Sequence, residues 1–540
     1  IVTPQHRVIW LLALTMLSAG AAADADRVSW PRVHADIGFL ADDLLEGRAA
    51  GTRGYDLAAR YVAAQMAQAG LEPAFGGDWL QRFPLLESRV DQAEAELTLD
   101  GQPLVPGEDF LAAKNFFAEE SVVAGSVVLA GFGVRAPELG HDDYAGLDVR
   151  GRIVAMFSGA PATFPNDQRA FHSSGTRKAR LAAELGAAGI ITIRTRVDQE
   201  RVAWDRMQNG AAFPRMRWLD DEGRPHDAFP RLKGAAVLSD GARGRLFDAV
   251  AMTESQALDA AAAGTAPRMD LNLTARMRTV SRISPAQSSN VGGLLPGGDP
   301  TRRDEWIVIT AHLDGLGLGP EIEGDAIYNG AYDNASGIAF LLETARLLAA
   351  DDAAPARSVL FLAVGAEERG LLGSDYFARH PPVPIDRIVA NTNMDMAIMT
   401  FPVADIVAFG AEHTTLGLMA ARAAEDAGFR IAPDPMPEEV IFIRSDQFSF
   451  VKQGVPAIYL DVGTGSRDPT VDGSEAVREF LTTHYHRPSD DMTRTFHVDS
   501  MVRFVAANLA LIRAIADAPD PPRWRKGNFF GETFGPDRVE

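Results

Sequence analysis

Two adjacent glutamates, Glu367 and Glu368, follow the apolar run "SVLFLAV", which has the length and composition of a buried strand. Two further predicted strands end in a similar way: "WIVITA" is followed by His312 and Asp314, and "RIVANTNM" is followed by Asp395. In a doubly wound sheet the carboxyl ends of the parallel strands lie at one edge, where ligands bind. Three strands would therefore bring carboxylates and an imidazole, which are metal ligands, to the same edge.

Two connecting segments add groups of the same kinds. Asp333 lies in "NGAYDNASG", where a glycine-rich loop enters a helix, and "HYHRPSDD" supplies His484, His486 and Asp490. The candidate ligands are two imidazoles and three carboxylates, with one further glutamate. This inventory fits two zinc ions that share a carboxylate, each holding one histidine and one further carboxylate, with a water between them.

Each of these residues also has a structural interpretation. Asp314 or Asp490 alone is typical of a turn or a cap, and Asp333 could cap the helix that follows it. A single histidine after a strand, such as His312, is commonly structural, and paired glutamates could begin a solvated helix. The co-occurrence of all these groups at strand ends favours a metal, because buried carboxylates must be paired or metal-bound.

Composition restricts the kinds of protein that this chain can be. Its 540 residues exceed the size at which a single hydrophobic core stops growing, which predicts two domains. A formal net charge of −21 argues against binding to nucleic acid, whose phosphate backbone attracts basic proteins. The absence of cysteine excludes disulfides, thiolate zinc sites and a cysteine nucleophile, so any metal must be held by His, Asp and Glu.

The N-terminal residues have the layout of a secretory signal peptide. Arg7 precedes the apolar stretch "VIWLLALTML", and the small residues of "SAGAAADA" follow it. The stretch is too short for a membrane anchor, since a transmembrane helix needs about 20 apolar residues. We therefore expect a cleaved signal over residues 1–25, no membrane span in the mature protein, and a periplasmic or secreted bacterial location.

The remaining chain predicts an α/β fold with a mostly parallel central sheet flanked by helices. Between residues 268 and 516, short continuous apolar runs alternate with amphipathic helices, which is typical of a sheet covered on both faces. The first part of this domain would be residues 26–118. Residues 119–267 have shorter β runs and predict a separate β-rich α/β insert, while the proline-rich tail 517–540 is expected to be loosely attached.

At these residues the sequence resembles the co-catalytic zinc exopeptidases of metallopeptidase family 28, which include bacterial aminopeptidases and glutamate carboxypeptidase II. The resemblance lies in an ordered set of motifs: "AHLDGLG", "GAYDNASG", "AEERGLLGS", "NTNMDM", "RSDQFSF" with "GVPAIYL", and "YHRPSDD". The early segment "LADDLLEGRAAGTRGYDLAARYV" also resembles the start of the family, and the insert resembles a protease-associated domain. The implied fold is that of the phosphorylase/hydrolase-like zinc exopeptidases.

The resemblance implies a role for each ligand candidate. His312 and Asp395 would bind one zinc ion, Glu368 and His486 would bind the other, and Asp333 would bridge the two. His486 is preferred over His484 because of its spacing to the aspartate that follows in the motif.

The resemblance also implies roles for residues beside the ligands. Glu367 would be the general base, and Tyr485 would help to stabilise the oxyanion. Asp314 and Asp490 would accept hydrogen bonds from the ligand imidazoles and orient them. Arg444 is a candidate substrate contact, with a structural ion pair as its alternative, and the Asp333–Asn334 peptide bond is a candidate for the cis form.

These observations together predict an exported di-zinc exopeptidase that removes N-terminal residues from peptides. The alternatives are a carboxypeptidase acting on acidic dipeptides, a glutaminyl cyclase-like enzyme, which generally works with one zinc, and a receptor-like binding protein without catalysis. The expected cofactors are two Zn²⁺ ions and the expected partner is a peptide substrate. Side-chain specificity and oligomeric state stay open.

Overall fold

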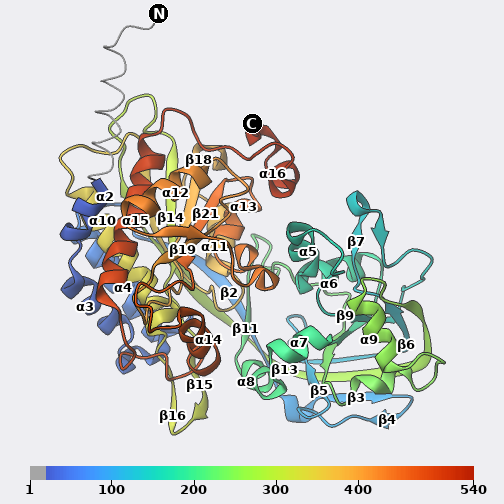
Figure 1. Ribbon diagram of the computed structural model, residues 1–540. Helices are drawn as coiled ribbons and strands as arrows, with labels where there is room; N and C mark the ends of the chain where they lie inside the picture. Colours follow the sequence, from blue (N-terminus) through green and yellow to red (C-terminus); the bar gives the residue numbers. More distant parts are fainter. Residues whose placement is uncertain (1–19) are drawn as a thin grey trace, which may run out of the picture. The chain divides into compact units, whose positions relative to one another are not determined.

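The computed structural model describes residues 20–540, which divide into two compact units (Figure 1). The first unit contains the described residues up to Phe83 together with Gln287–Glu540, and the second unit is Pro84–Ala286. Most of the predicted signal peptide, residues 1–25, lies outside the described residues, which begin with helix α2 (Gly20–Arg27).

The first unit is built on a mostly parallel sheet flanked by helices, which confirms the predicted fold class. Four parallel strands lie side by side in the order β17 (Ser358–Val364), β14 (Trp306–His312), β18 (Ile388–Asn393) and β21 (Ala457–Val462). The last part of β13 (Arg268–Leu295) pairs antiparallel with β17. At the other side β19 (Asp405–Phe409) pairs antiparallel with β21 and parallel with β20 (Arg430–Ala432).

Both faces of this sheet are buried, as its continuous apolar strands require. In β14, Ile307 and Ile309 point into one hydrophobic core and Val308 points into another, because successive side chains of a strand face opposite ways. The first core includes apolar residues of helices α3 (Trp30–Leu40), α4 (Arg53–Gln68), α10 (Gly337–Ala349), α12 (Leu416–Asp426), α14 (Gly473–Thr483) and α15 (Val498–Asp517). The second includes apolar residues of α11 (Leu372–Arg379) and α13 (Gln447–Val451).

The strand order creates a binding crevice at one edge of the sheet. From β14 the chain passes through α10 to β17 on one side of β14, and then through α11 to β18 on its other side. Strand β14 is thus the point at which the order of the strands reverses, and open α/β sheets bind ligands beyond the carboxyl ends of such strands. His312 is the last residue of β14.

The second unit has a smaller mixed sheet of its own. Strands β6 (Glu120–Ala130), β9 (Ile153–Phe157), β10 (Gly189–Ile193) and β12 (Gly234–Leu238) are parallel neighbours in this order. Its helices are α5 (Asn166–Ser173), α6 (Gly175–Glu184), α7 (Arg196–Arg201), α8 (Trp204–Ala212) and α9 (Glu254–Ala262).

The second unit is longer than the insert expected at residues 119–267. Strand β3 (Glu96–Leu99) pairs with the first part of β13, and β5 (Phe110–Ala112) pairs with β12, so residues on either side of the expected insert belong to this unit. The composition of these short flanking strands carries no signal that would assign them to one sheet or the other.

The C-terminal tail is held firmly, so the prediction that residues 517–540 are loosely attached is wrong. The Trp524 side chain is fully buried, and its indole Nε1 donates a hydrogen bond to the carbonyl of Gly454 at 2.9 Å. The Arg538 guanidinium donates to the carbonyls of Ile388 and Ile385. The tail also forms helix α16 (Phe529–Phe534), so its proline content does not prevent it from packing.

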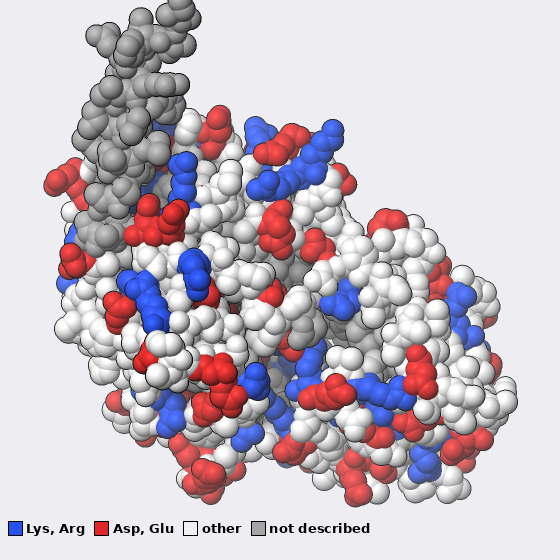
Figure 2. Space-filling model, viewed as in Figure 1, with Lys and Arg blue, Asp and Glu red and all other residues white. Residues whose placement is uncertain are grey.

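The surface carries charges of both signs. Figure 2 shows acidic and basic side chains interspersed over the visible face of both units. Within residues 20–540, none of the helices combines the length and the apolar character that crossing a bilayer requires.

Candidate metal centre

Five side chains at the crevice of the first unit form two groups that could each hold a metal ion. One group is His312, Asp333 and Asp395, and the other is Asp333, Glu368 and His486, so Asp333 belongs to both. In each group the potential ligand atoms lie within 4.8 Å of one another. These are the five residues that the sequence analysis put forward as metal ligands, and the fold brings them together.

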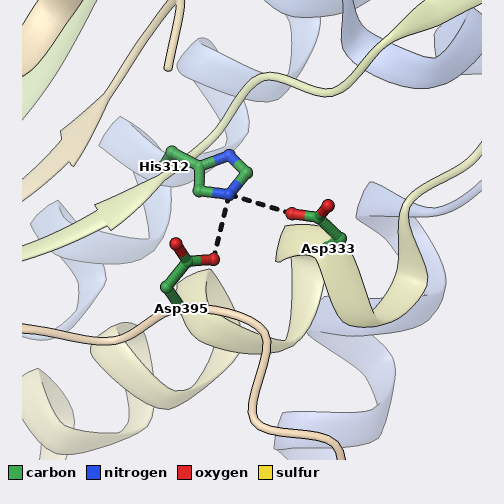
Figure 3. Close-up of side chains that lie close together, drawn as sticks. All are labelled: His312, Asp333 and Asp395. Carbon is green, nitrogen blue, oxygen red and sulfur yellow. Dashed lines mark hydrogen bonds and ion pairs between the residues drawn. The ribbon is translucent and has the colours of Figure 1, made fainter. Parts of the chain in front are cut away.

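The two oxygens of Asp333 face different histidines. His312 Nε2 lies 3.1 Å from Asp333 Oδ1 and 3.1 Å from Asp395 Oδ1 (Figure 3). His486 Nε2 lies 3.2 Å from Asp333 Oδ2 and 3.3 Å from Glu368 Oε2. A carboxylate placed in this way can contribute one oxygen to each of two ions.

These distances fit tetrahedral zinc. Zinc binds nitrogen and oxygen at roughly 2.0–2.1 Å, so neighbouring ligand atoms of a tetrahedral site lie about 3.3 Å apart. Each group supplies three ligand atoms, which leaves the fourth position of a tetrahedron for water or substrate, as in catalytic zinc sites. Because the donors are imidazole nitrogens and carboxylate oxygens, without sulfur, the chemistry of the donor set also suits zinc.

Burial makes a positive charge at this centre necessary. The side chains of His312, Glu368 and Asp333 are only 1%, 5% and 8% exposed, whereas His486 keeps 34% of its surface exposed and borders solvent. Burial lowers the pKa of His312, but the charges of Asp395 and Glu367 outweigh it and hold that pKa well above its ordinary value. Buried carboxylates at this density need a cation to compensate them.

The paired glutamates lie in the loop between β17 and α11 and do not begin a helix. The carboxylate of Asp314 accepts hydrogen bonds from the backbone N–H groups of Glu367 at 2.9 Å and Glu368 at 3.3 Å. The imidazole Nδ1 of His312 instead contacts the backbone carbonyl of Asp314 at 3.1 Å. The expectation that the Asp314 carboxylate orients the imidazole is therefore corrected: this carboxylate holds the backbone of the glutamate pair.

Asp490 has a comparable role on the other loop. Its carboxylate accepts hydrogen bonds from the backbone N–H groups of Tyr332 at 2.9 Å and Asp333 at 3.0 Å, and so fixes the loop that carries the shared ligand. The expectation that the Asp490 carboxylate orients the His486 imidazole is corrected: it binds the backbone of this loop instead. The peptide bond between Asp333 and Asn334 is cis, which agrees with the expectation from the sequence.

The other ligand carboxylate, Asp395, is fixed at two points. Its Oδ2 accepts a hydrogen bond from Ser445 Oγ at 2.6 Å, and its backbone carbonyl accepts one from Tyr459 Oη at 2.6 Å. The Oδ1 atom is thereby turned towards His312. Sequence analysis assigned no role to Ser445 or Tyr459, although both lie in the quoted motifs "RSDQFSF" and "GVPAIYL".

A fully buried arginine, Arg48, lies close enough to the centre to interact with its carboxylates. Its guanidinium donates to the carbonyls of Leu40, of Leu313, which directly follows His312, and of Asn329 and Gly330, which come shortly before Asp333. Burial lowers the pKa of Arg48 to about 10, and the charges of Asp314, Asp490, Asp333 and Glu368 oppose that shift. The sequence analysis assigned no role to this residue, although it lies in the quoted segment "LADDLLEGRAAGTRGYDLAARYV".

Three further candidates from the sequence lie near the centre in different ways. The ring of Tyr485 stacks on the imidazole of His486 with centroids 3.8 Å apart. His484 points away from the ligand groups, because its Nδ1 contacts Ser489 Oγ at 2.9 Å and its Nε2 lies 3.2 Å from Glu479. Arg444 forms an ion pair with Glu439 at 2.5 Å, and its contact with substrate stays a prediction.

Comparisons with known proteins point to one family. Residues 290–512 match Peptidase family M28. A protein of Pyricularia oryzae named "Probable zinc metalloprotease" is 35% identical over 136 residues, which are 24% of this chain and 26% of that protein. Aminopeptidase YwaD of Bacillus subtilis is 36% identical over 97 residues, or 18% of this chain and 19% of that protein. The matched segments therefore span about a quarter or less of these relatives' own lengths.

A solved structure shows that the similarity extends to the fold. The aminopeptidase from Aneurinibacillus sp. strain AM-1 superposes with a TM-score of 0.55 and 19% sequence identity, over 92% of this chain and 96% of that one. The matched family segment contains the three strand ends and the two loops that carry the five candidate ligands. Residues 290–512 of the chain are therefore similar in sequence to peptidase family M28, and the chain shares its fold with this aminopeptidase.

Proposed function

We propose that the chain is a zinc aminopeptidase with two zinc ions. His312 and Asp395 would hold one ion, Glu368 and His486 would hold the other, and Asp333 would bridge them. The observation that carries this proposal is the position of the Asp333 carboxylate. One of its oxygens faces His312 and the other faces His486, so that it belongs to both three-ligand groups. The zinc metalloprotease and aminopeptidase relatives support the same cofactor and activity.

The protein residues divide the catalytic work. Zinc, when bound, supplies a Lewis acid that polarises the scissile carbonyl and makes water acidic enough to attack at neutral pH. Glu367 belongs to neither ligand group, and its carboxylate takes a proton from the attacking water and later donates it to the nitrogen of the leaving amine. Tyr485, which stacks on His486, donates a hydrogen bond from its hydroxyl to the developing oxyanion.

The geometry favours this function over the alternatives. A glutaminyl cyclase-like enzyme would need only one zinc, whereas the chain provides two complete groups. A receptor-like binding protein would have no need to keep all five candidate ligands together with Glu367, a carboxylate that belongs to neither ligand group. Among peptidases, we favour removal of N-terminal residues because the carboxylates around the centre can accept hydrogen bonds from a free amine.

Two further parts of the proposal rest on the sequence. The N-terminal segment supports export through a signal peptide, with the mature enzyme in the periplasm or outside a bacterial cell. We also propose that the second unit is a module of the protease-associated type.

Metal dependence provides the first test. We expect a chelator to abolish hydrolysis of aminoacyl chromogenic substrates, added zinc to restore it, and the restored protein to contain two zinc ions by elemental analysis. Unchanged activity in chelator would rule out the metal mechanism, and restoration at one ion per chain would rule out the paired centre.

The second test separates aminopeptidases from other peptidases. Peptides with a free N-terminal amine should be hydrolysed, whereas the same peptides with an acetylated N-terminus should not be. Cleavage of the acetylated peptides at their C-terminal bond would assign the chain to the carboxypeptidases instead.

A further inference from the structure

The second unit contains a cavity of about 250 Å³ that the proposed peptidase chemistry does not use. Its walls come from the segment after β5, the start of α6, strand β11 (Arg215–Trp218) and the segment that leads into β12. Sites for drug-sized ligands have volumes of about 300–1,000 Å³. A cavity just below that range fits a ligand of about one amino-acid residue.

One side of the cavity is aromatic. Phe116, Phe117 and Phe229 line it, and 42% of Phe117 is exposed. The backbone at this ring is held, because Asn115 Oδ1 accepts hydrogen bonds from the N–H groups of Phe117 at 2.7 Å and Ala118 at 3.2 Å. An exposed phenylalanine next to a cavity provides an apolar surface for a ligand.

The charged side chains that line the cavity are mostly basic. They are Lys114, Arg217 and Lys233, against the single acidic residue Asp227. The carboxylate of Asp227 is bound by the guanidinium of Arg180. The net charge of the chain is −21, so the positive charge of this cavity is opposite in sign to that of the whole protein. A positively charged cavity favours an anionic ligand.

Arg217 is positioned to bind such an anion. Its guanidinium lies 5.3 Å from the centre of the Phe116 ring, and hydrogen bonds to the backbone carbonyls of Asp227 and Met216 fix its plane. Carbonyl oxygens orient the guanidinium without neutralising its charge. Helix α6 adds to the positive potential, because Gly175 and Thr176 at its N-terminus line the cavity and its first turn has no acidic residue.

We propose that this cavity binds the C-terminal residue of a peptide. Arg217 and the neighbouring lysines would bind the terminal carboxylate, and an apolar or aromatic side chain would pack against Phe116, Phe117 and Phe229. A peptide end is favoured over a free amino acid, because the ammonium group of a free amino acid would need an acceptor and Asp227 is engaged by Arg180. The site lies wholly within the second unit.

The test uses three small probes on the full-length, zinc-loaded protein. N-acetylphenylalanine carries the carboxylate and the ring, N-acetylphenylalanine amide lacks the charge, and free phenylalanine adds an ammonium group. Calorimetry should show at least 10-fold tighter binding of N-acetylphenylalanine than of either other probe. Equal binding of the acid and the amide would contradict a carboxylate site, and tighter binding of free phenylalanine would contradict a peptide end.

Matched variants locate the site. Arg217→Gln and, separately, Lys233→Gln should each weaken binding of N-acetylphenylalanine, by at least 10-fold for Arg217→Gln. Arg215→Gln, which removes the same charge from the same strand outside the cavity, should leave binding unchanged. Lys233 is exposed, so its variant keeps the test valid if Arg217→Gln does not fold.

The same experiment separates this site from the metal centre. Binding that survives Arg217→Gln but is lost in chelator would place the probe on the metal ions and overturn the proposal. Hydrolysis of aminoacyl substrates should be unchanged in Lys233→Gln, so the outcome for the cavity does not depend on the outcome for the peptidase activity.

Discussion

At the scale of single residues, the two neighbouring glutamates of the centre have different surroundings. Glu368 Oε2 lies 3.3 Å from His486 Nε2, within a ligand group, whereas Glu367 belongs to neither group. Burial, together with the charges of Glu368 and Asp446, raises the pKa of Glu367 well above its ordinary value, although His312 opposes the shift. A carboxylate with an elevated pKa can carry a proton between two steps of a reaction.

Substitution of Glu367 tests the proposed roles of the two glutamates. Glu367→Gln should retain zinc at the wild-type stoichiometry while kcat falls by roughly 10²–10⁴-fold, which is the usual contribution of general acid–base catalysis. Steady-state kinetics and elemental analysis measure the two quantities. The matched variant Glu368→Gln should lose metal as well as activity, and the reverse pattern would mean that the roles of the two glutamates are exchanged.

The five candidate ligands, which the fold brings together, could be found in the sequence because each occupies a recognisable position. His312 ends a buried strand, Glu368 and Asp395 come shortly after buried strands, and Asp333 and His486 lie in loops with distinctive motifs. The contacts around them could not be predicted. Whether Asp314 contacts an imidazole or the backbone of another loop depends on the spacing between β14 and β17, and only the folded sheet sets that spacing.

At the scale of elements, Arg48 connects the loops that carry the centre. Arg48 lies at the end of the 3₁₀ segment Asp43–Arg48. It donates to the carbonyl that directly follows His312 and to two carbonyls shortly before Asp333. The backbone next to Arg48 is closely packed, because a Cβ added at the preceding residue, Gly47, would lie 2.5 Å from the carbonyl oxygen of Tyr328. One side chain thus replaces the hydrogen bonds that regular secondary structure would supply.

Removal of this side chain should cost both stability and metal binding. Arg48→Met leaves buried carbonyl oxygens without donors, at about 1–3 kcal/mol for each one that stays unsatisfied. We expect the free energy of unfolding in urea to fall by about 3 kcal/mol or more, and zinc affinity to fall because the loop that ends in Asp333 loses its anchor.

The nearby Arg53→Met is the control, because Arg53 is exposed at the start of α4. Arg48→Lys, which keeps the charge but has fewer donors, should give an intermediate loss. An unchanged zinc affinity in Arg48→Met would show that the metal centre does not depend on this anchor.

At the scale of the whole molecule, each unit has its own cores and buries charged groups of its own. In the second unit the ammonium group of Lys178, on α6, is buried and donates to the carbonyls of Phe157 and Gly159 at 2.8 Å each. Burial lowers the pKa of Lys178 from 10.5 to about 8, although the charges of Asp198 and Asp143 oppose the shift.

This lysine should make the stability of the second unit depend on pH. Between pH 8 and 10.5 the unfolded chain holds the Lys178 proton more tightly than the folded one, so the free energy of unfolding should rise with pH in this window. A shift of this size corresponds to about 3 kcal/mol. Unfolding in urea at pH 7 and pH 10 measures it.

Lys178→Met serves as the reference, because other groups also titrate over this range. The gain in stability between pH 7 and pH 10 should be larger in the wild type than in Lys178→Met. Equal changes in the two proteins would show that the ammonium group is not destabilised by its burial.

The sequence predicted the parallel sheet and the separate insert, but not where the units divide or how the tail packs. Periodic apolar runs identify strands and helices, whereas the sheet that a short strand such as β3 joins depends on long-range pairing with β13. The burial of Trp524 likewise depends on Gly454, a residue far away in the chain. Composition indicated a proline-rich tail and could not show that one tryptophan anchors it.

The hydrogen bonds of Asp314 have a consequence for how the centre can be observed. The amide protons of Glu367 and Glu368 are bound by the Asp314 carboxylate, so they exchange with solvent when these hydrogen bonds open. The exchange of these two amide protons therefore shows, without any substrate, whether the loop that carries the glutamate pair is in place. Their hydrogen–deuterium exchange would measure how often the resting protein loses its active arrangement while the rest of the sheet stays folded.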